Sequence, residues 1–409
     1  MTDGRMADGR LSRIARSWWA RLGLGGASFG ALFGLGVWAS ACDNIGAAAN
    51  GPRRARVEQS PQWQGGAFMN TLPRVDGPAG QMIQSWLFGG SDHREPSSVL
   101  PIEARRRSDY DTPPASGLRV TWLGHSTLLV EIDGARVLID PVFGERASPF
   151  SFSGPKRWYA PPLPLSELPP IDVIVISHDH YDHLDADFVR AMASSGVRFA
   201  VPLGIGAHLE SWGIAPDRIA ELDWWQETTV GALTLTATPA RHFSGRWIND
   251  QGQTLWCGWA MRGPAHRAYY SGDTAMFGGF NDVGQRLGPF DVTMVEAGAY
   301  DRQWADVHLG PEQAVLAHQM VKGGVFIPVH WGLFDLALHG WTEPIERVVV
   351  AAEAAGVTIA SPRPGERIEP ASVTGVVRWW PQVPWQTVAE APAWSSNVEE
   401  LIAPAKAWR

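Results

Sequence analysis

The chain has 409 residues, of which 45% are hydrophobic and 19% charged, so it has enough apolar material for a core and is not globally disordered. Its 34 basic and 42 acidic residues give a formal net charge of −8, which disfavours general binding to nucleic-acid phosphates. The only two cysteines, Cys42 and Cys257, exclude a disulfide framework and a cysteine-rich metal site.

The first predicted element, residues 1–42, is an export signal or a membrane anchor. Arginines precede an uncharged stretch at 22–41, which ends in Ala-Ser-Ala, and this order is typical of a secretory signal. Cys42 follows directly, so the segment resembles a bacterial lipoprotein signal in which this cysteine is acylated. An uncleaved anchor and a simple cleaved signal are the alternatives, because about 20 apolar residues can span a bilayer. The prediction is a chain in the cell envelope, membrane-anchored on the periplasmic side.

The segment at 43–116 is rich in Pro, Gly, Ser and Arg, which favours a linker and a wrapping segment. A domain is predicted at 117–365 and an extension rich in Pro and Trp at 366–409. Within the domain, strands are predicted at 118–123, 127–132, 136–139, 171–176, 198–201, 233–238, 254–261, 268–271, 292–296 and 325–329. Helices are predicted at 185–194, 204–212, 310–321 and 344–355. Grouped strands interleaved with helices indicate an α/β (α+β) fold with sheet packed on sheet and helices outside.

Three histidines and two aspartates stand within six positions directly after a predicted buried strand. They are His178, Asp179, His180, Asp182 and His183. A strand end gains no stability from so many ionisable groups, since clustered charges repel or lose solvation. Neutral imidazole and carboxylate are ligands for zinc and similar first-row ions. Because alternate residues project together, we expect the first two histidines to bind one ion, and Asp182 with His183 to bind a second.

Two ions need further ligands, and three candidates follow later predicted strands. His242 would complete the first ion and His330 the second. Asp273 would bridge both ions with its two carboxylate oxygens. Each residue alone is an ordinary strand-end residue, but together they stand where one shared site requires them.

These residues resemble the metallo-β-lactamase superfamily. The string at 178–183 matches its His-x-His-x-Asp-His signature, and His242, Asp273 and His330 follow in the order of the family. A narrower similarity, covering roughly 75–365, is to N-acylphosphatidylethanolamine-hydrolysing phospholipase D and related bacterial zinc-dependent hydrolases. It is carried by Val-Thr-Trp-Leu-Gly-His-Ser-Thr at 120–127, Leu-Ile-Asp-Pro at 138–141, Gly-Pro-Lys-Arg at 154–157, Ala-Arg-His-Phe-Ser-Gly-Arg at 240–246 and His-Trp-Gly at 330–332.

The resemblance implies an αββα metallo-β-lactamase sandwich with the site at one edge. It also implies two Zn²⁺, or other first-row divalent ions. The implied ligands are His178, His180 and His242 on one ion, Asp182, His183 and His330 on the other, and Asp273 between them.

Three further residues acquire roles from the resemblance. His308 aligns with another active-site histidine of the phospholipase branch, where it would stabilise an oxyanion or protonate a leaving group. Asp140 corresponds to a buried acidic residue that supports the metal-binding turns, and His125 lies near the site of the family.

The resemblance implies a dinuclear zinc-dependent phosphodiesterase of the phospholipase D type, acting on N-acylphosphatidylethanolamine-like lipids through a metal-bound hydroxide. Besides ligating, Asp182 would orient that hydroxide. Three arginines, Arg157, Arg241 and Arg246, are candidates to bind a phosphate group. Tryptophans in predicted loops are candidates to line an apolar groove.

Two other functions stay open. One is a lactonase-like or other metal-dependent ester hydrolase of the same superfamily, and the other is a non-catalytic, metal-binding envelope lipoprotein. The expected partners are a phospholipid or another ester-containing small molecule and a membrane surface, with a homodimer as an option. Nucleic acid is excluded because the chain is acidic and shows no nucleic-acid-binding module.

Overall fold

The computed structural model describes residues 43–75 and 77–408, so the predicted signal at 1–42 lies outside the described residues. One compact unit extends from Gly46 to the C-terminus. Within the described ranges, no helix is both long and apolar enough to cross a membrane.

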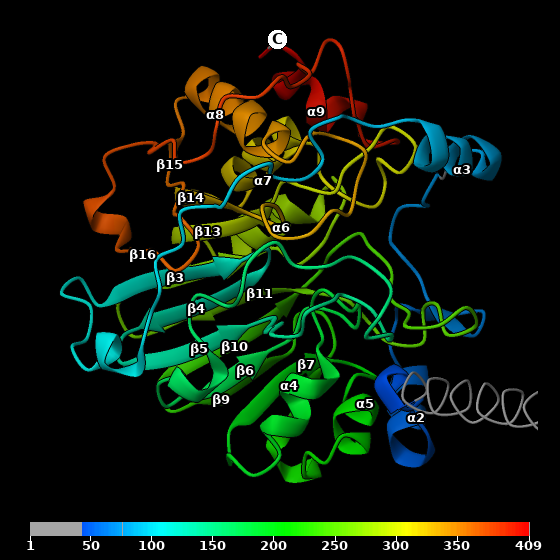
Figure 1. The fold of residues 1–409 in the computed structure, drawn as a ribbon. Helices are drawn as coiled ribbons and strands as arrows, with labels where there is room; N and C mark the ends of the chain where they lie inside the picture. Colours follow the sequence, from blue (N-terminus) through cyan, green and yellow to red (C-terminus); the bar gives the residue numbers. More distant parts are fainter. Residues whose placement is uncertain (1–42, 76, 409) are drawn as a thin grey trace, which may run out of the picture. The chain divides into compact units, whose positions relative to one another are not determined.

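The first of two seven-stranded sheets is built mainly from the N-terminal half of this unit (Figure 1). Strands β3, β4 and β5 are antiparallel neighbours, and β5 to β8 run parallel. In sheet order the strands are β16 (Arg367–Ile368), β3 (Leu118–Gly124), β4 (Thr127–Ile132), β5 (Ala135–Ile139), β6 (Val173–Val175), β7 (Arg198–Pro202) and β8 (Ile219–Leu222).

The second sheet mirrors this mixed arrangement. Strands β9 to β12 are antiparallel neighbours, whereas β12 to β15 run parallel. In sheet order the strands are β15 (Thr358–Ile359), β14 (Gly323–Val329), β13 (Phe290–Glu296), β12 (Arg267–Tyr270), β11 (Gly258–Arg262), β10 (Leu233–Thr238) and β9 (Glu227–Val230).

Alternation along the strands creates two apolar layers. In β4, Leu128 and Val130 belong to the large core between the sheets, whereas Leu129 belongs to a second core on the other face. Successive side chains of a strand point to opposite faces, so a strand that is covered on both faces is buried throughout. This explains why β4 is buried at every position.

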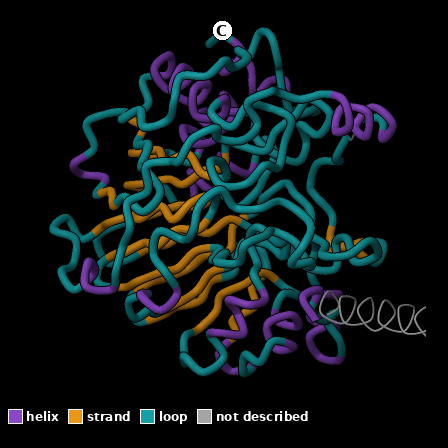
Figure 2. The backbone as a smooth tube through the Cα atoms, viewed as in Figure 1, coloured by secondary structure: helices purple, strands orange, loops and turns teal. Residues whose placement is uncertain are grey.

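Helices cover the outer faces of both sheets, as Figures 1 and 2 show. Residues of α4 (Ala186–Ala191) and α5 (Gly206–Ser211) share the second core with the first sheet. Helix α7 (Pro311–Met320) packs on β13 and β14, and α6 (Gly279–Arg286) and α8 (Glu343–Ala355) pack on α7. The expected mixed α/β sandwich is therefore confirmed.

The segments on either side of the domain contribute ordered structure. Helix α2 (Gly51–Glu58) is held by Arg53, which forms ion pairs with Glu210 and Glu221. Strand β16 pairs with β3, and the last helix packs on α7. The remaining elements are β1 (Trp63–Gln64), β2 (Ala67–Phe68), α3 (Ala79–Phe88), α9 (Glu399–Lys406) and the 3-10 turns Arg107–Tyr110, Leu165–Glu167, Pro216–Arg218 and Pro370–Ser372.

Several predicted bounds were wrong, for local reasons. The strand predicted at 254–261 begins only at Gly258, because Leu255 and Cys257 donate their backbone N–H groups to Leu203 and Ser177 of the first sheet's loops. The helix predicted at 185–194 begins one residue later, since Asp185 is its N-cap and accepts from two backbone N–H groups. Strands β8 and β9 and helix α6 were not predicted.

Candidate metal centre

All seven predicted ligand residues lie in loops that follow strands. The string at 178–183 follows β6 of the first sheet, whereas His242, Asp273 and His330 follow β10, β12 and β14 of the second. Both sheets therefore deliver side chains to one edge of the sandwich, and the structure brings all seven together.

One cluster consists of His178, His180, His242 and Asp273. One potential ligand atom from each lies within 4.8 Å of all the others. His180 Nδ1 lies 2.8 Å from His178 Nε2 and 3.3 Å from His242 Nε2. Three imidazoles and a carboxylate at this spacing form a donor set that zinc accepts.

A second cluster consists of Asp182, His183, His330 and His125, with ligand atoms again within 4.8 Å of one another. The Asp182 carboxylate lies 3.5 Å from the Nε2 atoms of both His183 and His330. It also lies 2.9 Å from His125 Nε2, so His125 lies near the site as expected.

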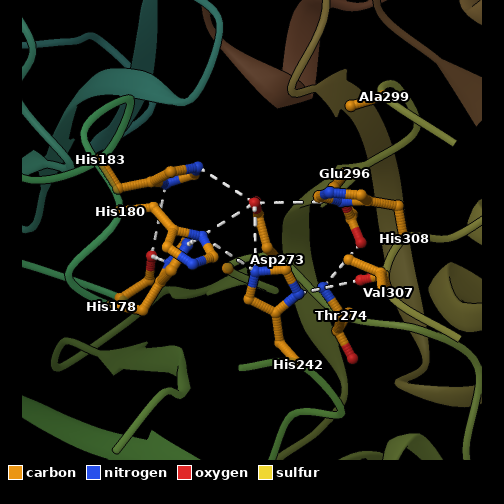
Figure 3. Close-up of polar contacts among 12 residues, drawn as sticks. His178, His180, His183, His242, Asp273, Thr274, Glu296, Ala299, Val307 and His308 are labelled. Carbon is orange, nitrogen blue, oxygen red and sulfur yellow. Dashed lines mark hydrogen bonds and ion pairs between the residues drawn. The ribbon is translucent and has the colours of Figure 1, made fainter. Parts of the chain in front are cut away.

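The two clusters meet at one oxygen of Asp273. Its Oδ2 lies 3.2 Å from His183 Nε2 and 2.9 Å from His330 Nε2, on one side. On the other side it lies 3.7 Å from His178 Nε2 and 3.8 Å from His242 Nε2. Figure 3 shows contacts that converge on this carboxylate.

Unsatisfied buried atoms test whether the clusters fit metal ions. His183 Nε2, His330 Nε2 and Asp273 Oδ1 are buried and make no hydrogen bond. Buried polar atoms without partners are rare, and three of them within one site require an explanation. A divalent cation accepts lone pairs from such atoms, so the residues present fit a metal site.

Hydrogen bonds behind the ligands fix which ring nitrogen faces the cluster. His242 donates from Nδ1 to the Val307 carbonyl at 2.9 Å, which leaves Nε2 free. Asp140, fully buried, lies 2.8 Å from His183 Nδ1 and accepts from Tyr270 at 2.6 Å and from the Ser177 hydroxyl. Such outer partners orient metal ligands. Asp140 thus holds the turn that carries the candidate ligands.

The pKa values of these residues show how charge is balanced at the site. Burial holds the pKa values of His178 and His242 well below the ordinary range, which favours the neutral imidazole that binds metal. Burial alone would lower the pKa of His330, but Asp273 and Asp182 outweigh it and raise that pKa to about 10. The carboxylates therefore attract positive charge to this cluster, which a metal ion also supplies.

The predicted residue His308 lies beside both clusters. Its ring centroid is 5.2 Å from that of His242 and 4.9 Å from that of His330. Its Nδ1 lies 2.7 Å from Glu296 Oε2. Sequence reasoning missed Glu296, although a charged residue at the end of the otherwise uncharged run 292–296 was an available signal. Burial raises the pKa of Glu296, and His308 offsets this only in part.

The three arginines proposed to meet a phosphate have structural contacts instead. Arg241 is buried, forms an ion pair with Asp306 at 3.0 Å and donates to backbone carbonyls. Arg157 and Arg246 also donate to backbone carbonyls of the site loops. Their proposed role in phosphate binding is therefore withdrawn.

Two cavities adjoin the clusters. One of about 20 Å³ lies at His330 and is lined partly by Trp158, Trp331 and Trp341. The other, of about 380 Å³, has His242 in its wall. Its apolar lining comes from Phe68, Met69, Leu72, Phe243 and Trp256.

Comparisons with known proteins agree with this geometry. A family model described as a beta-lactamase superfamily domain matches residues 135–331. An uncharacterized protein of Mycobacterium tuberculosis is 47% identical over 335 residues, which cover 80% of this chain and 89% of the relative. The N-acyl-phosphatidylethanolamine-hydrolyzing phospholipase D 1 of Caenorhabditis elegans is 38% identical over 258 residues, 60% of this chain and 72% of the relative. The mitochondrial phospholipase of the same name from Saccharomyces cerevisiae is 30% identical over 277 residues, 63% of this chain and 58% of the relative.

Fold, clusters and relatives together define a metal-dependent hydrolase. The chain belongs to the metallo-β-lactamase superfamily, in the branch related to N-acylphosphatidylethanolamine-hydrolysing phospholipase D.

Proposed function

We propose that the protein is a dinuclear zinc-dependent phosphodiesterase of the phospholipase D type that hydrolyses N-acylphosphatidylethanolamine-like lipids. The observation that carries the proposal is the shared position of Asp273 Oδ2, within 3.8 Å of ring nitrogens from both clusters. The names of the nematode and yeast relatives support the lipid class.

The proposed ligand set follows the two clusters. His178, His180 and His242 would hold one ion, Asp182, His183 and His330 the other, and Asp273 both. When bound, a pair of divalent cations lowers the pKa of water and neutralises charge that develops on a phosphoryl oxygen.

Two residues are proposed to act on the substrate or on water. Asp182 Oδ2 lies 2.9 Å from His125 Nε2 and 3.5 Å from the Nε2 atoms of His183 and His330, where it can orient a water molecule. The side chain of His308 is 13% exposed, whereas those of His242 and Glu296 are fully buried, so His308 is the more accessible group for a leaving oxygen.

The cavity of about 380 Å³ supports a substrate with an apolar substituent. Its volume lies in the range of small-molecule sites, and its walls are mostly apolar or aromatic. The cavity borders the loop that carries His242 and Phe243, so an acyl chain in the cavity would lie against this loop of the site.

A membrane surface is the proposed location of this substrate. Met69, Val75, Trp86 and Phe88 are exposed apolar residues within 20 positions of one another, and α3 carries no charged side chain. We propose a protein of the cell envelope, with a catalytic domain at 117–365. The export signal and the homodimer stay predictions.

The experiment is turnover of N-acylphosphatidylethanolamine in mixed micelles by the zinc-loaded protein, with products identified by mass spectrometry. The proposal predicts equal amounts of phosphatidic acid and N-acylethanolamine, because water adds to phosphorus while the ethanolamine oxygen leaves with a proton. Activity should be lost on chelation and in His178→Ala, but kept in His266→Ala, since His266 pairs with Asp133 outside the site. Intact lipid after prolonged incubation would contradict the proposal.

A panel of lactones, read by the release of acid, tests the alternative. Hydrolysis of a lactone without hydrolysis of the lipid would identify a carbonyl ester as the substrate. Tight metal binding without turnover of either class would favour the non-catalytic function.

A further inference from the structure

A buried carboxylate stands behind the proposed substrate-facing histidine. Glu296 is the last residue of β13 and is fully buried. Its Oε1 accepts from the backbone N–H groups of Thr274 at 2.6 Å and Leu309 at 3.1 Å. Its Oε2 lies 2.7 Å from His308 Nδ1. Burying a carboxylate is costly unless it is fully hydrogen-bonded, and these three donors meet that requirement.

These contacts connect two parts of the site. Thr274 directly follows Asp273, the residue shared by both clusters, and Leu309 directly follows His308. Glu296 therefore fixes the backbone beside the shared carboxylate and also the ring of His308. A neutral residue of similar shape could keep the two backbone bonds through one oxygen, but not the contact that the second oxygen makes with the ring.

The contact with Glu296 decides which nitrogen of His308 carries the proton. With Glu296 ionised, its carboxylate only accepts hydrogen bonds, so Nδ1 donates. The other nitrogen, Nε2, has no hydrogen-bond partner among the residues that the structure describes, and the side chain is 13% exposed. A neutral ring held in this way presents a lone pair at Nε2.

We propose that Glu296 is a positioning residue that keeps the proton of His308 on Nδ1 and leaves Nε2 as the ring nitrogen available to the substrate. The role toward a substrate rests on the proposed function, whereas the position of the proton does not. The carboxylate acts through the histidine and does not itself touch the reacting atoms.

The tautomer can be read from long-range ¹H–¹⁵N spectra of ¹⁵N-histidine-labelled protein, with and without zinc. The signals of His308 are assigned by their absence in His308→Gln. The wild-type spectrum should show a protonated Nδ1. In Glu296→Gln the amide N–H₂ would face Nδ1, so the proton should move to Nε2. A proton on Nε2 in the wild type would overturn the proposal, even if the variant does not fold.

Kinetics on the phosphodiester substrate give a second measurement. Glu296→Gln should lower kcat by about 10- to 100-fold with little change in KM. Losses of this size are typical when a residue that orients an active-site histidine through a hydrogen bond is replaced. Combining it with His308→Gln should add no further loss, because both changes remove the same oriented nitrogen. Zinc content, measured by mass spectrometry, should stay that of the wild type.

The matched control is Glu369→Gln, because Glu369 also accepts two backbone N–H groups, from Ala115 and Ser116. Its kcat and the His308 spectrum should be unchanged. Additive losses in the double variant would contradict the proposal. Failure of every phosphodiester to react would remove the proposed function, while the spectrum would still decide the role of Glu296.

Discussion

Three residues at the site have backbone conformations that side chains other than glycine rarely adopt. His125, Asp140 and His330 have positive φ angles of 52°, 39° and 65°. Such conformations persist only where the surroundings enforce them, and they concentrate at functional sites. Here His330 donates its backbone N–H to the His125 carbonyl at 3.0 Å, so two of the strained residues hold each other.

Asp140 offers the sharpest test of the supporting hydrogen bonds. In Asp140→Asn, the amide N–H₂ replaces an oxygen acceptor and cannot accept from His183, Ser177 or Tyr270. We expect zinc affinity to fall about 10- to 100-fold, measured by competition with a chromogenic chelator. Tyr270→Phe removes only one of these bonds and should cause a smaller loss. Equal affinity in wild type and Asp140→Asn would show that Asp140 does not orient the ligands.

Gly298 tests the tight backbone approach beside His330. A Cβ atom at Gly298 would lie 2.1 Å from the His330 carbonyl oxygen. Gly298→Ala should therefore lower the free energy of unfolding by about 1–3 kcal/mol and weaken zinc binding. Gly278→Ala is the control, because a Cβ atom there meets nothing within 4 Å, and its unfolding should change by at most about 0.5 kcal/mol. Chemical denaturation of both variants measures these free energies of unfolding, and equal values would contradict the role assigned to Gly298.

Among the elements, α7 is buried almost throughout, although its sequence contains charged and polar residues. The buried carboxylate of Glu312 is neutralised by Arg347, whose guanidinium donates hydrogen bonds to both carboxylate oxygens at 2.9 and 2.8 Å. Near the end of the helix, His318 is 2% exposed, and its Nδ1 forms a hydrogen bond of 2.7 Å with the Thr293 hydroxyl. Burial lowers the pKa of His318 to about 4, so the folded protein keeps this ring neutral.

The buried His318 predicts a pH dependence of stability. Between about pH 6.5 and pH 4 the unfolded chain binds a proton that the folded protein does not, so the free energy of unfolding falls as the pH falls. A difference of about 2.5 pKa units at about 1.4 kcal/mol each gives roughly 3.5 kcal/mol. The free energy of unfolding, measured by denaturation of the zinc-loaded wild type and of His318→Gln across this pH range, should depend less on pH in the variant. An equal dependence on pH in wild type and variant would contradict the contribution assigned to His318.

The sequence predicted the long central elements better than the edge elements. Strand β4 contains the apolar run 128–130, and in β13 the apolar residues Phe290, Val292 and Met294 recur at every second position, so both are identified without tertiary information. Strand β9, by contrast, has the sequence Glu-Thr-Thr-Val and is a strand because it pairs with β10. Helix α3 has no charged residue and no capping side chain, so no local pattern marks its start.

For the whole molecule, the candidate centre joins the two sheets. The string at 178–183 comes from the first sheet, and His242, Asp273 and His330 come from the second. Because a ligand that binds only the folded state stabilises it, zinc at 100 times its Kd should add about 2.7 kcal/mol for each ion. Thermal unfolding with zinc and with a chelator tests this, and His178→Ala should respond less than His266→Ala. An unchanged melting temperature would exclude tight binding.

The site was partly predictable because one of its parts is contiguous. Five ionisable residues in six positions mark 178–183 in the sequence itself. Single residues such as His330 became candidates only through their positions after predicted strands, to which the family resemblance then added a ligand role. Glu296 was marked only by its charge. Its contact with His308 and the structural contacts of Arg241 and Arg246 could not be predicted, since they depend on which carbonyls and imidazoles the loops bring near.

The spread of the centre over both sheets has a consequence for biosynthesis. A chain is made from its N-terminus, so 178–183 leaves the ribosome about 150 residues before His330. During that interval the proposed ligands at 178–183 stand without their later partners, so the complete candidate site does not yet exist. Correct loading therefore has to be a late event, and the cellular supply of ions at that moment, more than intrinsic affinity, would decide which metal the finished protein carries.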